Sequence, residues 1–285
     1  MIPLQRFGVL AHPLRPQSVP VSAAIVDSLR QHGFDAWALD TWTEEELINA
    51  LHNTGMVIAI GGDGAMLHAA RVCGPASVPV LGVNMGKLGF LTEIPPDEWD
   101  RTLPLLLDNQ FWVEDRMMIT ARVIRSGGEC LRVEALNDVV ISRGGEMGLA
   151  RVSAYIDGGW TTTYNCDAVI VATATGSTAY ALASGGPILP PELRNMLIVP
   201  VAPHLSLDRS IVLPQGADVE LRIEEMRTQP FLAVDGTKAF QFQADDLLRV
   251  QASQHTARFV RLREKTYFYR SLLDRLEPRV SNEPR

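Results

Sequence analysis

Cysteine is scarce in this chain, and its spacing excludes two kinds of site. Among 285 residues only three are cysteines, Cys73, Cys130 and Cys166, and no Cys-x-x-Cys pair occurs. An odd, scattered set supports neither a disulfide framework nor a zinc site, so we expect three buried free thiols. The six histidines do not form a metal motif either. No cysteine or histidine is therefore predicted to ligate a metal, and no metal site is predicted from their spacing.

Long apolar runs and basic blocks are also missing. No run of the sequence is long enough to cross a bilayer, and residues 1–16 lack the basic start and apolar core of a signal peptide. We therefore expect a cytoplasmic protein without a membrane partner. The net charge of −7, without a basic stripe, argues against a nucleic-acid partner. It is still compatible with an anionic small ligand, because backbone amides and a cation can bind one.

The first hundred residues alternate between strand and helix patterns. Strand patterns lie at 7–11, 34–39, 56–60 and 78–83, and helix patterns lie at 18–31, at 47–51 after a capping box from Thr43 to Glu46, and from Ala65 onward. This order predicts an α/β domain, a parallel sheet with helices on both faces, over residues 1–105.

After about Phe111 strand patterns dominate. They lie at 118–124, 131–133, 138–142, 150–156, 169–172, 219–223, 231–234, 247–251 and 258–262, with turn signals at 126–128, 157–159 and 214–216. We expect an all-β sandwich over 106–264. A helical piece at 271–276 predicts that residues 265–285 pack back on the first domain, and the tail from Glu277 looks loose.

The most informative motif is Gly-Gly-Asp-Gly at 61–64, between the strand at 56–60 and a helix start. Glycines let the backbone approach a ligand, and a helix N-terminus offers N–H groups to an anion. Asp63 would repel a phosphate, so we expect it to accept a proton from an attacking hydroxyl or to hold a metal ion. This combination points to phosphoryl transfer, although a glycine turn that merely joins strand to helix is the alternative.

Further clusters accompany this loop. Residues 84–91 follow the next strand at the same sheet edge, where open α/β sheets bind ligands. Residues 173–180 are rich in hydroxyl and small side chains and run into Gly185 and Gly186; they can bind an adenine or ribose, or form a polar loop with a packed tyrosine. Asn137 and Asp138 can bracket a ribose or form a turn. Asp235 and Gly236 signal a hairpin first and a site second.

Taken in order along the chain, these clusters, together with Ala202, Pro203 and His204, resemble the NAD kinase family from about residue 55 to 240. The Gly-Gly-Asp-Gly loop alone also resembles diacylglycerol and sphingosine kinases. The resemblance implies transfer of phosphate from ATP to the 2′-hydroxyl of the adenosine ribose of NAD, which gives NADP. It also implies a divalent cation, expected to be Mg²⁺, a two-domain fold, and a homodimer or homotetramer.

The resemblance assigns roles by position in the motifs. Asp63 would be the catalytic proton acceptor, and Gly64 and His68 would lie along the phosphates of the dinucleotide. Asn137 and Asp138 would hold ribose and base. Asp167 and Ala202 would complete the site, often from a neighbouring subunit. The remaining expected binding residues are Asn165, Thr178, Ala179, Tyr180, Ala181, Leu182, Ala183 and Thr237.

Several positions depart from the family pattern. Ala183 stands where a serine is frequent, and Ala174 replaces a proline. Asn165, and the stretch Glu146, Met147 and Gly148, stand where basic residues are frequent. None of these changes touches the loop at Asp63. Two other functions share features with this sequence: a lipid kinase built on the same loop, and a non-catalytic protein that senses NAD or NADPH.

Overall fold

The chain divides into two units, which are described separately. The computed structural model describes residues 5–40, 43–86, 89–144, 148–225, 229–266, 268, 269 and 272. The first unit runs to Glu114 and takes up the chain again at Arg258, and the second is Asp115–Ala257. The predicted helical piece at 271–276, except Leu272, and the tail from Glu277 lie outside the described residues, as do Lys87, Leu88, Glu146 and Met147.

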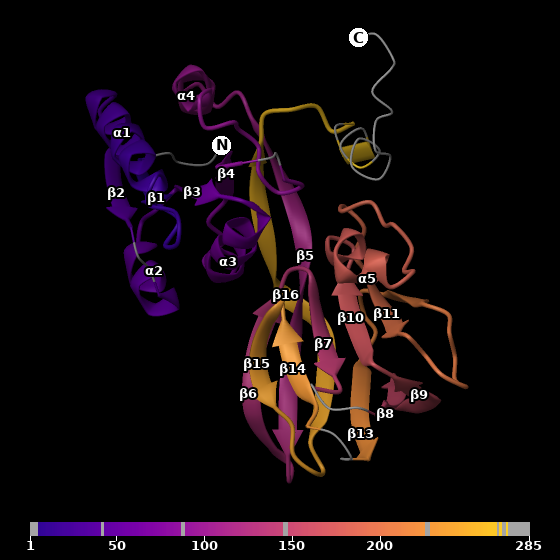
Figure 1. Ribbon diagram of the computed structural model, residues 1–285. Coiled ribbons are helices and arrows are strands. Elements are labelled where there is room, and N and C mark those ends of the chain that lie inside the picture. The colour runs from indigo at the N-terminus through magenta and orange to yellow at the C-terminus, as the bar shows by residue number, and fades with distance from the viewer. Residues whose placement is uncertain are drawn as a thin grey trace. The chain divides into compact units, whose positions relative to one another are not determined.

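The first unit is built on a parallel sheet in the order β2-β1-β3-β4 (Figure 1). Its elements are β1 (Arg6–Leu10), α1 (Ser18–Gln31), β2 (Asp35–Leu39), α2 (Glu44–Ala50), β3 (Met56–Gly61), α3 (Asp63–Cys73), β4 (Val80–Asn84) and α4 (Trp99–Leu107). The last residues of β16 (Leu247–Arg261) extend this sheet, because Phe259 pairs with Val80 in parallel. The predicted parallel α/β domain is confirmed.

Both faces of this sheet are covered, which explains the unbroken apolar runs of its strands. Every residue of β3 and β4 is buried. Alternate strand residues such as Ile58 and Leu81 share one core with side chains of α1 and α4, and α2 and α3 lie on the other side of the strands (Figure 1). The predicted capping box at the start of α2 is present, with the Thr43 hydroxyl accepting the N–H of Glu46.

Gly82, in the middle of β4, lets two layers approach the strand closely. A Cβ atom at this position would lie 2.7 Å from the sulfur of Met66 on α3 and 2.9 Å from the Cα of Thr92. The carbonyl of Gly82 also accepts the N–H groups of Glu93 and Ile94 at 2.9 and 3.0 Å. This glycine therefore sets the distance between α3, β4 and the segment that follows β4.

The second unit is a sandwich of two antiparallel sheets. One contains β5 (Trp112–Arg125), β6 (Gly128–Ala135), β8 (Ala150–Ile156), β9 (Gly159–Cys166), β13 (Val219–Glu225) and the first part of β16. The other has the order β12-β11-β10-β7-β14-β15, formed by β7 (Asp138–Ser142), β10 (Ala168–Thr173), β11 (Asn195–Val201), β12 (Ile211–Pro214), β14 (Phe231–Val234) and β15 (Thr237–Gln241). The predicted all-β sandwich is confirmed.

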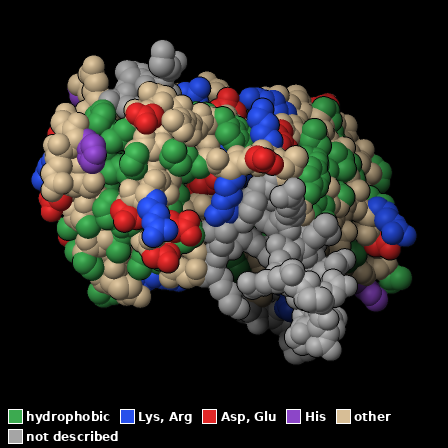
Figure 2. All heavy atoms as spheres, turned by 90° about the horizontal axis from the view of Figure 1, so that it is seen from above, with side chains coloured by type: hydrophobic (Ala, Val, Ile, Leu, Met, Phe, Trp, Pro, Cys, Tyr) green, Lys and Arg blue, Asp and Glu red, His purple; other side chains and the backbone are tan. Residues whose placement is uncertain are grey.

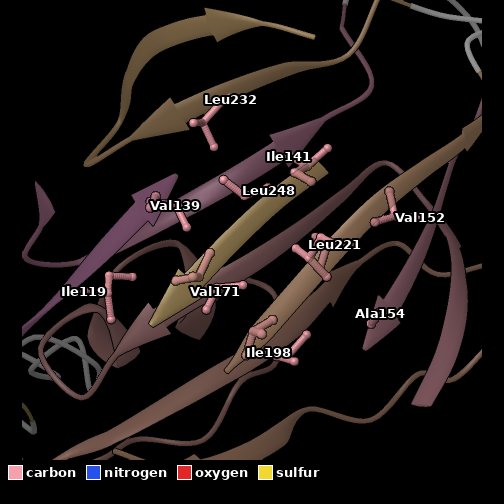
Figure 3. Packing of buried hydrophobic residues seen from close by; sticks show 14 of the residues in the cluster. Ile119, Val139, Ile141, Val152, Ala154, Val171, Ile198, Leu221, Leu232 and Leu248 are labelled. Carbon is pink, nitrogen blue, oxygen red and sulfur yellow. The ribbon is translucent and has the colours of Figure 1, made fainter. Parts of the chain in front are cut away.

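The core of this unit lies between the two sheets. Figure 3 shows Ile119, Leu221 and Leu248 of one sheet pointing toward side chains of the other, among them Val139 and Val171. The outer face of the second sheet carries a smaller cluster, in which Ala181 of the short helix α5 (Tyr180–Ala183) packs on Ile170 and Leu197. This places the loop after β10 against the back of its own sheet.

Several elements differ from the sequence prediction. Strands β9, β11, β12 and β15 and helix α4 were not predicted, and the stretches 247–251 and 258–262 belong to one strand, β16. Helix α4 lacks a side-chain cap, which is the usual start signal, and contains the helix breaker Pro104, so local sequence signals do not mark it as a helix. All three cysteines are free as expected, but Cys130 is exposed and only Cys73 and Cys166 are buried.

Among the described residues, no helix combines the length and the apolar character that crossing a bilayer requires. On the face drawn in Figure 2, acidic and basic side chains are interspersed, and the described residues there form no stripe of basic charge.

The contacts of Gly82 predict that Gly82→Ala destabilises the first unit by about 1–3 kcal/mol, since the added methyl group meets backbone that cannot move freely. Gly216→Ala is the matched control, because a Cβ atom there has no neighbour within 4 Å. Chemical denaturation of both variants measures the difference. Equal stability of the two variants would contradict the prediction and show that the segment after β4 can shift to accommodate the methyl group.

Candidate functional site

The loop at Asp63 is a tight turn from strand to helix at the carboxyl end of β3. A Cβ atom at Gly61 would lie 2.6 Å from that of Ala65, so this glycine is required by packing. At Gly62 and Gly64, in contrast, a Cβ atom would have no neighbour within 4 Å. Open space therefore borders the first turn of α3, whose leading N–H groups have no partners within the helix. This arrangement suits a phosphate or another anion.

Two backbone amides hold the carboxylate of Asp63. The N–H of Phe90 donates to Oδ2 and that of Leu91 donates to Oδ1, both at 2.9 Å. Gly89 lies directly against the carboxylate, and a Cβ atom at this position would overlap it. Because each carboxylate oxygen accepts about two hydrogen bonds, both oxygens keep capacity for a second donor or a cation. Asp63 is half-buried, so it is fixed in place while still reachable.

Sequence reasoning assigned no role to His12 and Arg15, which follow β1 at the same sheet edge. The ring of His12 lies near Gly61, and Nη1 of Arg15 donates to the carbonyl of Met85 at 2.9 Å. Partial burial and then the charge of Arg15 lower the pKa of His12. The signal that could have found them is their place just after the carboxyl end of a parallel strand. Arg15 brings a positive charge to this edge.

His68 lies one turn into α3, as expected, and is half-buried. Its Nε2 is 3.7 Å from the carboxylate of Glu44, which also pairs with Arg71 at 2.6 Å. Burial and then the charge of Arg71 lower the pKa of His68, while Glu44 acts in the opposite direction. His68 is thus held at the surface of α3 and favours its neutral form.

In the second unit, Asp235 organises the residues at the start of β7. Its carboxylate accepts the N–H groups of Leu136, Asn137 and Asp138 at 3.0, 2.7 and 3.2 Å. Asp235 and Gly236 have φ values of 46° and 80°, as a two-residue hairpin turn requires, and β14 pairs with β15 across them. The predicted hairpin is confirmed, and the turn carries Thr237 next to this group.

Asp138 is buried beside that turn. Burial raises its pKa to about 7, and the negative charge of Asp235 acts in the same direction. A buried carboxyl group next to a second carboxylate favours its protonated form. Asp138 is therefore poised to change charge near neutral pH.

The loop after β10 packs on the residues just before β7, Leu136 and Asn137. Thr173 donates from its N–H to the carbonyl of Asn137 at 2.8 Å and from its hydroxyl to that of Leu136 at 2.5 Å. A Cβ atom at Gly176 would overlap the carbonyl of Asn137. We use the name Asp138 cluster for Asn137 and Asp138 together with the expected binding residues of this loop and of the hairpin, which are Thr178, Ala179, Tyr180, Ala181, Leu182, Ala183 and Thr237. Tyr180 is exposed.

Asn165, Asp167 and Ala202 form a second group, the Asp167 cluster. The carbonyl of Asn165 accepts the N–H of His204 at 2.7 Å, and the N–H of Asp167 donates to Val201 at 2.9 Å. Asp167 also pairs with Arg143 at 2.8 Å. Asp167 precedes β10, whereas Asp138 pairs with Ala172 near the end of that strand. At about 3.4 Å per residue, the five residue steps from 167 to 172 separate Asp167 from Asp138 by roughly 17 Å along the strand, while Ala181 packs on Ile170 in its middle.

The donor set limits how a metal can bind. Within the described ranges no three His, Cys, Asp or Glu side chains gather as a metal cage requires. A single carboxylate such as Asp63 fits a hard cation whose other ligands are water and substrate phosphates, which is how Mg²⁺ is commonly held.

Comparison with protein families matches both halves of the chain. The model of the ATP-NAD kinase N-terminal domain matches residues 8–111, and that of the ATP-NAD kinase C-terminal domain matches residues 136–262. These ranges contain every candidate site residue named above.

Individual relatives agree over nearly the whole chain. An NAD kinase of Dehalococcoides mccartyi is 32% identical over 274 residues, which are 96% of each chain. An NAD kinase of Chloroflexus aurantiacus is 38% identical over 273 residues, which are 96% of this chain and 99% of that protein.

Solved structures show the same fold. A yeast NADH kinase, crystallised with NADH, matches with a TM-score of 0.81 and 22% identity, and the match covers 99% of this chain and 90% of that one. An NAD kinase from Archaeoglobus fulgidus in complex with ATP matches with a TM-score of 0.76 and 22% identity, and that match covers 94% and 98%.

The raised pKa of Asp138 predicts a pH-dependent stability. The folded state binds the proton of Asp138 up to about pH 7, whereas the unfolded chain releases it near pH 4. The contribution of Asp138 to stability therefore falls as the pH rises through this window, by about 1.4 kcal/mol for each unit of pKa shift.

Asp138→Asn should remove this slope. The measurement is the difference in free energy of unfolding between variant and parent from pH 4 to pH 8, which cancels the other titrating groups. A difference that stays constant over this range would show that Asp138 ionises normally in the fold.

Proposed function

The chain belongs to the NAD kinase family and phosphorylates NAD to NADP with ATP, and we propose that Asp63 accepts the proton that the reaction releases. The observation that supports this role is the position of its carboxylate, held by the amides of Phe90 and Leu91 beside the open space at Gly62 and Gly64. The match over both domains leaves no support for the lipid kinase, and the enzymatic relatives leave none for a non-catalytic sensor.

The chemical step needs positioning more than covalent help. The 2′-oxygen of the adenosine ribose attacks the γ-phosphorus of ATP, a new O–P bond forms, and the bond from the γ-phosphorus to the β–γ bridging oxygen breaks to release ADP. The hydroxyl proton moves to Asp63. A base within hydrogen-bond reach contributes roughly 10²–10⁴-fold. The amides that already hold Asp63 reduce the reorganisation this transfer requires.

In this proposal the expected binding residues of each unit have the following roles. Gly64 and His68, at the start of α3, lie along phosphates, and Arg15 adds charge at the same edge. Asn137 and Asp138 hold the ribose and base. Thr178, Ala179, Tyr180, Ala181, Leu182, Ala183 and Thr237 line the remaining pockets; these are the other members of the Asp138 cluster.

The Asp167 cluster serves the site of a second copy in this proposal. Asp167 lies roughly 17 Å along β10 from Asp138, too far for both side chains to contact one ring of the dinucleotide. A homodimer or homotetramer in which Asn165, Asp167 and Ala202 face the site of a neighbour accounts for this separation.

Members of the family use ATP together with a divalent cation, and we infer that here it is Mg²⁺. Asp63 is the side chain that fits it, with phosphate oxygens as further ligands. When bound, the cation neutralises charge on the transferring phosphate. The roles of Asp63 as base and as ligand compete for the same two oxygens.

Asp63→Asn separates these roles. If Asp63 is the base, kcat falls by roughly 10²–10⁴-fold while the Kd for NAD stays within a few fold, because size is kept and basicity is lost. Steady-state kinetics with NAD, ATP and Mg²⁺ measure kcat, and calorimetry measures Kd. Turnover close to that of the parent would refute the base, and recovery of turnover at raised Mg²⁺ would assign Asp63 to the cation.

Arg15→Met tests the added positive charge. A hydrogen bond to a charged group contributes about 1.5–3 kcal/mol, so the KM for ATP should rise by about tenfold or more, with the KM for NAD little changed. Arg30→Met is the matched control, because Arg30 also donates to a backbone carbonyl, that of Ala36 at 2.7 Å, away from the loop at Asp63. An equal KM for ATP in both variants would exclude Arg15 from phosphate binding.

A further inference from the structure

A buried ionic cluster lies next to the segment that holds Asp63. It consists of Glu93, Glu114 and Arg261, which are 4%, 6% and 7% exposed. The guanidinium of Arg261 donates from Nε to Glu114 at 2.7 Å and from Nη1 to Glu93 at 3.2 Å. All three residues belong to the first unit, although Arg261 comes from the end of β16. We call them the Arg261 cluster.

The Arg261 cluster is bonded directly to the backbone of residues 91–93. Nη1 of Arg261 donates to the carbonyl of Leu91 at 2.9 Å. The carboxylate of Glu93 accepts the N–H groups of Leu262 and Arg263 at 3.0 and 2.9 Å, and Arg263 donates back to the carbonyl of Glu93 at 2.6 Å. Five hydrogen bonds thus join the last residue of β16 and the two residues after it to the segment after β4.

Leu91 connects this cluster to Asp63. Its N–H donates to Oδ1 of Asp63, and its carbonyl accepts from Arg261. One residue away, the N–H of Phe90 donates to Oδ2 of Asp63, and the turn is closed by the N–H of Gly89 donating to the hydroxyl of Thr92 at 2.9 Å. The orientation of the two amides that hold Asp63 therefore depends on a short segment whose far side is fixed by Arg261.

Packing alone does not explain such a cluster. The attraction within a buried ion pair commonly offsets only part of the free energy lost on desolvation. Apolar residues of similar volume commonly stabilise a fold as well or better. The planar guanidinium of Arg261, however, reaches two carboxylates and a carbonyl at once, which an apolar side chain or a lysine does not do. The geometry favours a role in fixing position.

We propose that Arg261 is a positioning residue for the phosphoryl transfer: it orients the Leu91 backbone so that the amides of residues 90 and 91 keep the Asp63 carboxylate in its reactive place. This inference rests on the proposed role of Asp63. A displacement of about 1 Å at a reacting group costs about 10²-fold in rate, so a loosened segment lowers turnover without removing a substrate contact.

The first test is Arg261→Lys, which keeps the positive charge for Glu93 and Glu114 but loses the forked geometry. We expect kcat to fall by about 10- to 100-fold, with the KM values for NAD and ATP within about twofold. Arg125→Lys is the matched control: Arg125 also donates two bonds to a buried carboxylate, that of Asp246, but lies in the second unit. Melting curves identify loss of folding.

The second test places Arg261→Lys in the Asp63→Asn background. If Arg261 acts through Asp63, the lysine lowers the residual kcat of that background by less than about twofold, because the effects of two coupled residues are not additive. An equal loss in both backgrounds would make Arg261 a general structural residue and overturn the inference. An unchanged kcat for Arg261→Lys in the parent would also overturn it.

These outcomes are distinct from failure of the proposed function. If Asp63→Asn alone keeps near-parental turnover, the base assignment fails whatever Arg261 does. If Arg261→Lys does not fold, the variant carrying Arg261→Met, Glu93→Gln and Glu114→Gln replaces it, since it removes the three charges of the Arg261 cluster together. The kcat of this triple variant is then compared in the parent and in the Asp63→Asn background. An equal loss in both backgrounds, or an unchanged kcat in the parent, would again overturn the inference.

Discussion

The geometry of the candidate site in the first unit depends on one interaction, the pair of hydrogen bonds from the amides of Phe90 and Leu91 to the carboxylate of Asp63. Without these bonds the carboxylate of Asp63, at the start of α3, would be free to rotate. The bonds require the segment after β4 to return over the end of β3, and they require glycine at Gly89, where a side chain would overlap the carboxylate. Gly82 and the Arg261 cluster hold that segment from the other side.

The second unit also contains a turn whose carboxylate is held by backbone amides of a distant segment. The carboxylate of Asp235, at a tight hairpin turn, accepts three consecutive amides at the start of β7 and so shapes the backbone around Asn137 and Asp138. In both units a short acidic side chain in a turn is satisfied by backbone N–H groups of a distant segment. Both turns thereby obtain a defined shape without large side chains of their own.

Local patterns predicted much of the fold. The α1 helix, the capping box at Thr43, the parallel strands and the hairpin at Asp235 all depend on neighbouring residues, whose spacing can be read directly. The elements that were missed depend on contacts elsewhere. Helix α4 contains Pro104 and is stabilised by Leu103 and Leu106 packing into the first core. Strand β16 pairs with β4 only through its last residues, which no local pattern indicates.

The sequence by itself determined the family, the reaction and the two kinds of domain, and it singled out Asp63 as the candidate for the central acidic residue, because these follow from motifs whose chemistry is local. Only the tertiary structure decided what surrounds that residue. Its surroundings come from positions far apart along the chain: the amides of residues 90 and 91, Arg15 after β1, and Arg261 at the end of β16. Such contacts depend on strand pairing and burial, and a one-dimensional pattern carries no signal for them.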